Sequence, residues 1–386
     1  MAAACQPQMI VLLLLLVMLM HVQAVAVTTS RTASSMSIEG GDTWYIIASF
    51  PRLRQVNYMR LPDTTWRPLL PSDALLAPQA ICIDRENRRL FVADPSAAAV
   101  YWYQLKVLSD KRLITDGWRR LASSSIAAFG LAIDSVGSLY ISGRSRGMVP
   151  IDGIFKQDAA ILATGTSAAP RSLLTRANTA LGPNGTNPQL FEPSGLAVDS
   201  FNVYWANTAR ERHASSVMQA SISDDPVFMS PQATVQSSSQ APGSTIHVSL
   251  RLLSDSVDSI TSVALTEAGI LYSARGGVYG VSLSKGDQGC GEERSRCPLV
   301  AAVDDPTSVL WDGDGTVYVA DRGGGRICSF ASGTLAQHPL EGVAEAQGIH
   351  GIALLHEAAK SAVSSLSTVR ANTWRLLLSI FIALQA

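Results

Sequence analysis

Apolar and polar positions recur along this chain in one repeated phrase. Each copy has a short apolar run that ends in a polar residue, then a polar turn, then a second apolar run with an aromatic side chain. One clear copy is residues 130–134 (GLAID) followed by 138–142 (SLYIS), and others begin near residues 80, 195, 262 and 308. Two apolar runs joined by a tight turn predict a β-hairpin. Because no single hairpin can bury its own apolar face, the repeat predicts radially arranged sheets, that is, an all-β β-propeller.

The spacing of the copies predicts the number of blades. The residue that ends the first run falls at positions 84, 134, 199, 266 and 312. Residues 351–355 supply a sixth first run with no second run after it, and residues 42–49 supply a second run with no first run before it. We therefore predict a six-bladed propeller over residues 42–356, closed by N-terminal strands that complete the last blade. Such a closure pairs edge strands that would otherwise be exposed.

The outer strands carry weaker patterns. We expect third and fourth strands at residues 56–61 and 66–70, 100–105 and 118–121, and 216–221 and 245–250. The stretch 224–244 is rich in Ser, Gln and Pro, and such a composition cannot bury much apolar surface. It is predicted to be a mobile surface insertion.

The two ends of the chain look like targeting segments. An apolar run at residues 9–20 precedes the small-residue triplet 22–24, which predicts a signal peptide over residues 1–24, followed by an extension over 25–41. An uncleaved membrane anchor, the alternative, needs about 20 apolar residues. In the C-terminal tail, residues 357–386, small residues, a polar spacer and a short terminal apolar run form the pattern of a GPI-anchor signal. A terminal helix packed on the propeller or a disordered tail is the alternative.

These ends predict entry into the secretory pathway and an extracellular or cell-surface location, with the lipid anchor as the route to membrane attachment. Cys290 and Cys297 bracket a charged loop, and a disulfide between them is expected in that compartment. Cys82 and Cys328 occupy strand positions and are expected to be structural. Asn184 begins an N-glycosylation pattern in a predicted loop.

Charge argues against nucleic acid as a partner. The formal net charge is −1, and Lys and Arg are scattered along the chain. Binding to a phosphate backbone needs a basic stripe.

Two segments carry a family resemblance. Residues 317–330 (VYVADRGGGRICSF) closely resemble an NHL repeat, and residues 196–207 (LAVDSFNVYWAN) resemble the YWTD repeat of low-density-lipoprotein-receptor propellers. The resemblance covers roughly residues 42–356. It implies a six-bladed propeller that binds or scaffolds, as most members do, with a minority of enzymes.

The repeat register also predicts where a ligand would bind. If the first strand of each blade lines the channel, the residues just before each repeat surround its opening: Gln79, Phe129, Ser194, Thr261, Thr307 and His350. Polar groups on a rigid frame make this opening the default ligand site. We expect it to bind an extracellular or surface protein or a glycan without a cofactor and without catalysis.

A metal-dependent hydrolase is the alternative. Propellers that resemble lactonases or gluconolactonases build a Ca²⁺ site from oxygen ligands, and Glu192, Asn207, Asp305 and Asp321 could supply them. Against this, Ser194 stands where those enzymes carry an Asn, and Asp residues such as Asp94 and Asp321 also cap tight turns. A zinc site needs several histidines, and His350 alone stands at the opening. The recurrent aromatic residues of the second strands are expected to pack between blades.

Overall fold

The computed structural model describes residues 42–165, 169–175, 190–208, 215–222, 250–254, 259–283 and 297–358. Residues 44–356 form one compact unit, and its strands build six small sheets, so the all-β fold and the blade count are confirmed. The signal peptide, the N-terminal extension, Asn184, the insertion 224–244, Cys290 and the tail beyond residue 358 lie outside the described residues and stay predictions.

Each blade is an antiparallel sheet whose first strand is innermost. The closing blade has β25 (Ile352–Glu357), β1 (Thr43–Phe50), β2 (Gln55–Arg60) and β3 (Arg67–Pro68), with a 3₁₀ turn η1 (Pro51–Leu53). Blade 1 has β4 (Ile81–Asp84), β5 (Arg89–Asp94), β6 (Ala99–Val107), β7 (Leu113–Thr115) and β8 (Arg120–Ser124). Blade 2 has β9 (Ile126–Ile133), β10 (Leu139–Ser145), β11 (Asp152–Gln157) and β12 (Arg171–Thr175), with the short helix α2 (Ala159–Thr164) after β11.

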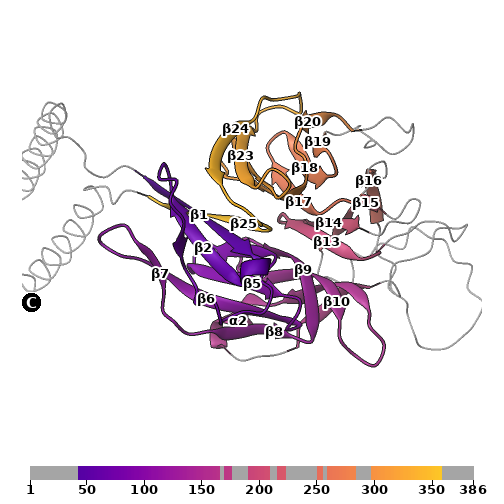
Figure 1. The fold of residues 1–386 in the computed structure, drawn as a ribbon. Coiled ribbons are helices and arrows are strands. Elements are labelled where there is room, and N and C mark those ends of the chain that lie inside the picture. The colour runs from indigo at the N-terminus through magenta and orange to yellow at the C-terminus, as the bar shows by residue number, and fades with distance from the viewer. Residues whose placement is uncertain are drawn as a thin grey trace, which may run out of the picture. The chain divides into compact units, whose positions relative to one another are not determined.

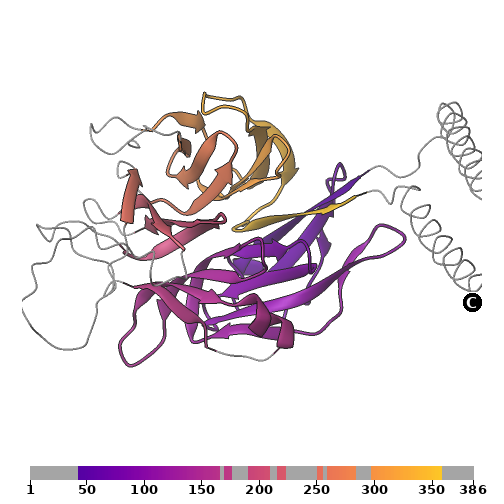
Figure 2. The ribbon, with the colours of Figure 1, turned by 180° about the vertical axis from the view of Figure 1, so that it is seen from behind.

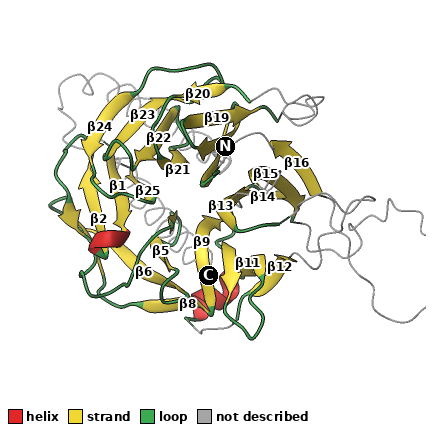
Figure 3. Cartoon of the chain, turned by 45° about the vertical axis from the view of Figure 1, so that its right-hand side comes forward, coloured by secondary structure: helices red, strands yellow, loops and turns green. Residues whose placement is uncertain are grey.

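The other three blades repeat the same order. Blade 3 has β13 (Pro193–Val198), β14 (Asn202–Thr208), β15 (Ser215–Ser221) and β16 (Leu250–Ser254). Blade 4 has β17 (Ser262–Thr266), β18 (Gly269–Ala274), β19 (Gly277–Val281) and β20 (Leu299–Ala301). Blade 5 has β21 (Pro306–Trp311), β22 (Thr316–Asp321), β23 (Arg326–Ala331) and β24 (Glu341–Glu345). Figure 3 shows the sheets arranged as a ring, with β9, β13, β21 and β25 toward its middle.

The ring closes as the sequence predicts. β25, from the C-terminal end, pairs with β1, from the N-terminal end, and the two strands lie side by side in both Figure 1 and Figure 2. The amide N–H of Ser49 donates to the carbonyl of Gly351 at 3.0 Å, and that of His350 donates to the carbonyl of Ser49 at 3.0 Å. The last blade therefore takes its inner strand from one end of the chain and its other strands from the other end.

The core lies between the blades. Six clusters of buried apolar side chains each join two neighbouring blades, so every junction of the ring has its own cluster. Tyr45, Tyr140, Trp205 and Tyr272 of the second strands are fully buried in these clusters. The expectation that the recurrent aromatic residues pack between blades is therefore confirmed for these four.

Two outer strands differ from the prediction. The fourth strand of blade 3 is β16, Leu250–Ser254, whereas residues 245–250 were expected, so the two share Leu250 alone. Blade 1 has an additional strand, β7, which pairs with the end of β6 beyond the main sheet. Outer strands are half exposed, and their apolar pattern is correspondingly weak.

The cysteines of the described residues are buried or half-buried. Cys82 and Cys328 are free thiols, and burial raises the pKa of both. Cys297 is buried, but its expected partner Cys290 lies outside the described residues, so that bridge stays a prediction.

Within the part of the chain that the structure describes, no helix has the length and apolar character needed to cross a membrane.

Candidate functional site

The six inner strands surround a channel. They enclose a cavity of about 350 Å³ whose walls are mainly Ile, Leu, Val and Ala side chains of these strands. At one end of the channel lie Thr261, Thr307 and His350, and at the other lies Arg85, whose guanidinium is 3.5 Å from the carbonyl oxygen of Asp312. The polar groups therefore gather at the ends of an otherwise apolar channel.

A second cavity lies at the end where the inner strands begin. It measures about 330 Å³, and we call it the mouth; it is lined by Gln79, Phe129, Arg144, Glu192, Ser194, Thr208, Thr261 and His350. Five of the six residues expected around the channel opening line the mouth together, and the sixth, Thr307, lines the channel beside His350. The structure thus brings this predicted set together, while its role in binding stays a prediction.

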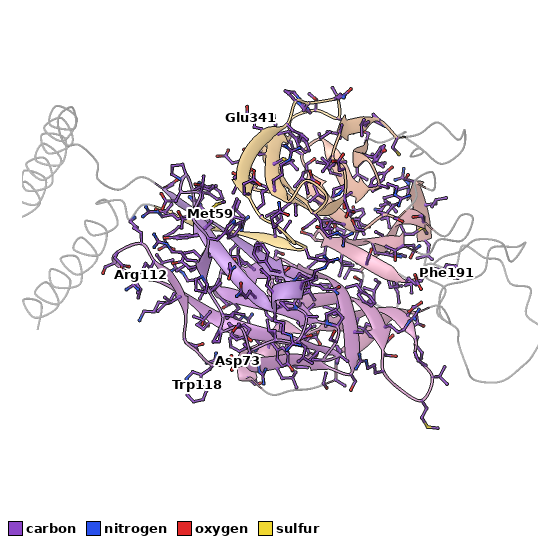
Figure 4. The ribbon with its side chains drawn as sticks, in the orientation of Figure 1. Met59, Asp73, Arg112, Trp118, Phe191 and Glu341 are labelled. Atoms are coloured by element: carbon purple, nitrogen blue, oxygen red, sulfur yellow. The ribbon has the colours of Figure 1, made fainter. Side chains whose placement is uncertain are left out.

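In Figure 4 the labelled residues distinguish the two faces of the ring. Phe191, in the segment that leads into β13, lies on the mouth side, and Arg112, in the turn between β6 and β7, lies on the opposite side. The chain begins β1 and ends β25 on the side away from the mouth, because both strands have their mouth ends at Ser49 and Gly351. Trp44 and His356, the first and last residues of the propeller, stack there with ring centroids 4.1 Å apart.

Hydroxyl groups near the mouth connect neighbouring blades. In each case a Ser or Thr donates to a carbonyl just before or at the start of the inner strand of the next blade: Ser49 to Gln79, Ser142 to Ser194, Ser194 to Ile260 (3.2 Å), Thr261 to Pro306 (2.9 Å) and Thr307 to His350 (2.7 Å). Between blades 1 and 2 the equivalent positions hold Gln79 and Ala93, which have no hydroxyl. Three of the predicted ligand residues, Ser194, Thr261 and Thr307, therefore also hold the ring together.

His350 differs from these residues because part of its side chain is unused. It is half-buried, it lines both the channel and the mouth, and its Nδ1 atom is buried with no hydrogen-bond partner among the described residues. The pKa of His350 is lowered from 6.5 to about 4, mainly by burial and in addition by the positive charge of Arg322, while Asp305 opposes the shift. The imidazole is therefore neutral at physiological pH, and a buried unpaired polar atom is costly unless a ligand satisfies it.

A charged group borders the mouth between blades 2 and 3. Arg144 binds Asp152 through two contacts, Nε to Oδ1 at 2.6 Å and Nη2 to Oδ2 at 3.1 Å, and this hydrogen bonding raises the pKa of Arg144. The Oε1 atom of Glu192 lies 3.8 Å from Nη2 of Arg144, and the Glu192 amide donates to Asp152 at 3.2 Å. This border carries both signs of charge, paired with each other.

Two of the candidate Ca²⁺ ligands are buried and used by the fold. The carboxamide oxygen of Asn207 accepts from the Phe191 amide at 3.0 Å and from the Trp205 indole at 3.1 Å, and its nitrogen donates to Ser216 at 2.9 Å. The Oδ1 atom of Asp321 accepts from the amides of Gly324 (2.9 Å) and Asp305 (3.3 Å). Both side chains hold the segment that leads into the inner strand of their own blade.

The other two candidate ligands are half exposed or more and face arginines. Asp305 pairs with Arg322 at 2.7 Å, and Glu192 lies beside Arg144. Among the described residues, no three His, Cys, Asp or Glu side chains are grouped so that they could hold a metal ion. In this arrangement the four candidate ligands are thus not gathered at one point, as a hard cation with several oxygen ligands would require, and their role in binding Ca²⁺ stays a prediction.

Two residues of the mouth were not expected. Arg144 and Thr208 stand one position beyond Gly143 and Asn207, at the ends of second strands. The register itself could have found them, because the predicted set extended along the second strands only as far as Asn207 and its equivalents.

No protein-family model matches this chain. Among curated proteins there is no match either. Among solved structures, it is similar to a chain of a nidogen/laminin complex, with a TM-score of 0.50 and 13% identity over 81% of this chain and 98% of that one.

It is also similar to a periplasmic gluconolactonase of Pseudomonas aeruginosa (TM-score 0.47, 11% identity, 81% and 99% coverage). A further similar structure is a calcium-binding protein, regucalcin, from Agrobacterium tumefaciens (TM-score 0.45, 13% identity, 80% and 81% coverage). At these identities the likeness concerns the fold. The chain belongs to the class of six-bladed β-propellers.

Proposed function

We propose that this propeller is a non-catalytic binding module, secreted or attached at the cell surface, that holds part of a protein or glycan in its mouth. The observation that carries the proposal is the unpartnered Nδ1 atom of His350 in a preformed cavity beside the ring of Phe129. Pockets for small molecules measure about 300–1,000 Å³. A mouth of about 330 Å³ therefore has room for one side chain or one sugar unit rather than a large ligand.

The placement of the chain ends supports this proposal. Both ends of the propeller lie on the face opposite the mouth. A lipid anchor attached through either end of the propeller would therefore join it on that face.

The hydrolase alternative makes a different prediction about metal. If Glu192, Asn207, Asp305 and Asp321 rearranged around Ca²⁺, bound ion would raise the melting temperature, and Glu192→Ala would remove that gain. We expect the melting temperature of the full chain, produced in a secretory host, to be the same in calcium and in chelator, and gluconolactone to hydrolyse at the buffer rate. A calcium-dependent gain of several degrees that Glu192→Ala abolishes would overturn the non-catalytic proposal.

Binding itself is tested with two probes, an immobilised glycan array and a phage-displayed library of random peptides. The variant His350→Phe fills the mouth and removes the unpaired nitrogen. The matched control is His338→Phe, because His338 lies in the segment between β23 and β24 and stacks on Phe330 with ring centroids 5.8 Å apart. We expect probes that bind the wild type to lose at least about tenfold in affinity with His350→Phe, or about 1.4 kcal/mol, and to bind the control unchanged. Equal binding by both variants, or no bound probe, would count against the mouth as a binding site.

A further inference from the structure

The turn between β10 and β11 forms a hairpin beside the mouth, residues 144–152, which we call the mouth hairpin. At its base Arg144 pairs with Asp152, the Ser145 amide donates to Ile151 at 2.9 Å, and the Ile151 amide donates to the Ser145 hydroxyl at 3.1 Å. Arg144 also lines the mouth. The mouth hairpin is thus continuous with the candidate binding site.

Arg146 ties the mouth hairpin to the blade next to it. Its amide donates to the carbonyl of Ser125 at 2.7 Å, and its guanidinium Nη2 donates to the carbonyl of Pro95 at 3.1 Å. Pro95 belongs to the turn that joins β5 and β6 of blade 1. The base is therefore held from both blades, which fixes where the tip of the hairpin stands.

The tip of the mouth hairpin is apolar and exposed to solvent. Met148 is fully exposed, Val149 is 73% exposed and Ile151 is 43% exposed. The residues between Arg146 and Ile151 are Gly, Met, Val and Pro. Contiguous apolar side chains on a surface mark interaction sites, because burying them against a partner removes them from water.

The surroundings of the tip indicate which class of partner would cover it. Asp152 pairs with Arg144, Arg146 is bound to carbonyl groups, and Glu192 adds a negative charge nearby. An anionic membrane attracts clusters of basic residues, whereas here two arginines, Arg144 and Arg146, are matched in number by Asp152 and Glu192. A glycan would need polar groups or an aromatic ring, and the four tip residues have neither. An apolar pocket on a protein fits the tip best.

We propose that the mouth hairpin docks a protein partner: Met148 and Val149 insert into an apolar pocket of that protein while a residue of the same partner enters the mouth. This inference rests on the proposed function and deepens it by naming a protein rather than a glycan. Because the tip residues 147–150 carry no charge, the contact is apolar and its affinity depends little on salt.

The experiment uses the full chain and peptides selected from the phage-displayed library on the wild type. The variant is Val149→Asp, and the matched control is Val136→Asp, since Val136 is 70% exposed in the turn between β9 and β10 on the opposite face. We expect the selected peptides to carry apolar residues and to lose at least about tenfold in affinity, or about 1.4 kcal/mol, with Val149→Asp alone. Equal melting temperatures would show that both variants fold.

Three results would overturn this inference. Peptides that bind Val149→Asp as tightly as the wild type but lose affinity with His350→Phe would leave the mouth as the binding site and remove the hairpin from it. Peptides whose affinity falls steeply with added salt would contradict an apolar contact. Sedimentation of the chain with vesicles of equimolar phosphatidylcholine and phosphatidylserine, abolished by Val149→Asp, would assign the hairpin to a membrane.

Discussion

Single polar residues near the mouth serve the fold in ways that resemble ligand binding. Asp94 accepts from the amides of Leu76 at 2.6 Å and Ala77 at 3.1 Å, and Asn207 and Asp321 bind the corresponding segments of blades 3 and 5. The sequence could place these oxygens at the ends of second strands. It could not tell a metal ligand from a turn cap, because that depends on which N–H groups the following chain brings within reach.

At the scale of a single residue, the burial of His350 predicts that the stability of the fold depends on pH. Its pKa in the fold is about 4 against 6.5 in the unfolded chain. Between these values the unfolded chain binds a proton that the folded chain does not, so stability falls as pH falls through this window, by up to about 1.4 kcal/mol per pH unit. The variant His350→Gln has no such proton to bind. We expect denaturant unfolding to show a flatter stability profile from pH 6.5 to 4 for His350→Gln, and an unchanged slope would contradict the burial of a neutral imidazole.

At the scale of elements, the sequence predicted inner strands well and outer strands less well. The inner hairpins carry apolar residues on both faces, because each face packs on a different neighbouring blade. That pattern recurs at equivalent positions in successive blades, so the sequence identifies the inner strands clearly. The pattern of β16 is Leu-Arg-Leu-Leu-Ser with two exposed positions, and the expected strand 245–250 started five residues before it. Because apolar and polar residues alternate only weakly in the outer strands, the sequence does not define the register of these strands.

The same register explains how far the site could be predicted. Residues just before each copy of the repeated sequence share a place in the ring, so Gln79, Phe129 and His350 could be grouped from the sequence alone. The mouth hairpin could not, because its contacts with Ser125 and Pro95 depend on how blade 2 meets blade 1 and do not recur elsewhere among the described residues. The part of the site that repeats is predictable, and the part that is particular to one blade is not.

Close approach of inner strands predicts a strict need for glycine. A Cβ on Gly130 of β9 would collide with the carbonyl oxygen of Ser194 and with the hydroxyl of Ser142, which bind each other across the junction of blades 2 and 3. We expect Gly130→Ala to destabilise the fold by roughly 1–3 kcal/mol, as overpacking does. Gly342→Ala in the outer strand β24 is the control, since open space surrounds Gly342. Chemical denaturation of both variants measures the difference, and equal stabilities would show that the blades approach less closely than described.

At the scale of the whole molecule, stability is shared around the ring. Each apolar cluster is formed by side chains of two neighbouring blades, so a single blade has no such cluster of its own among the described residues. A blade that separates from one neighbour therefore exposes the apolar face that it buried there and is held only by the junction on its other side. Repeats coupled in this way unfold together when the coupling exceeds the stability of the single repeat.

The coupling between blades can be tested at the closing blade, where β25 from the C-terminal end pairs with β1. Leu354 of β25 is 2% exposed and packs with Ile46 of β1 and Ala320 of blade 5, so it joins both chain ends to the neighbouring blade. Leu354→Ala should cost about 2–5 kcal/mol, whereas Leu252→Ala in the outer strand β16, where the side chain is 38% exposed, should cost much less.

Because every junction depends on its neighbours, Leu354→Ala should raise hydrogen exchange in β13 and β14 of blade 3 as much as in β1 of the closing blade. Mass spectrometry of peptides from both blades measures this. If β1 lost protection while blade 3 kept that of the wild type, the closing blade would open independently, and the pairing of β25 with β1 would stabilise one blade rather than the ring.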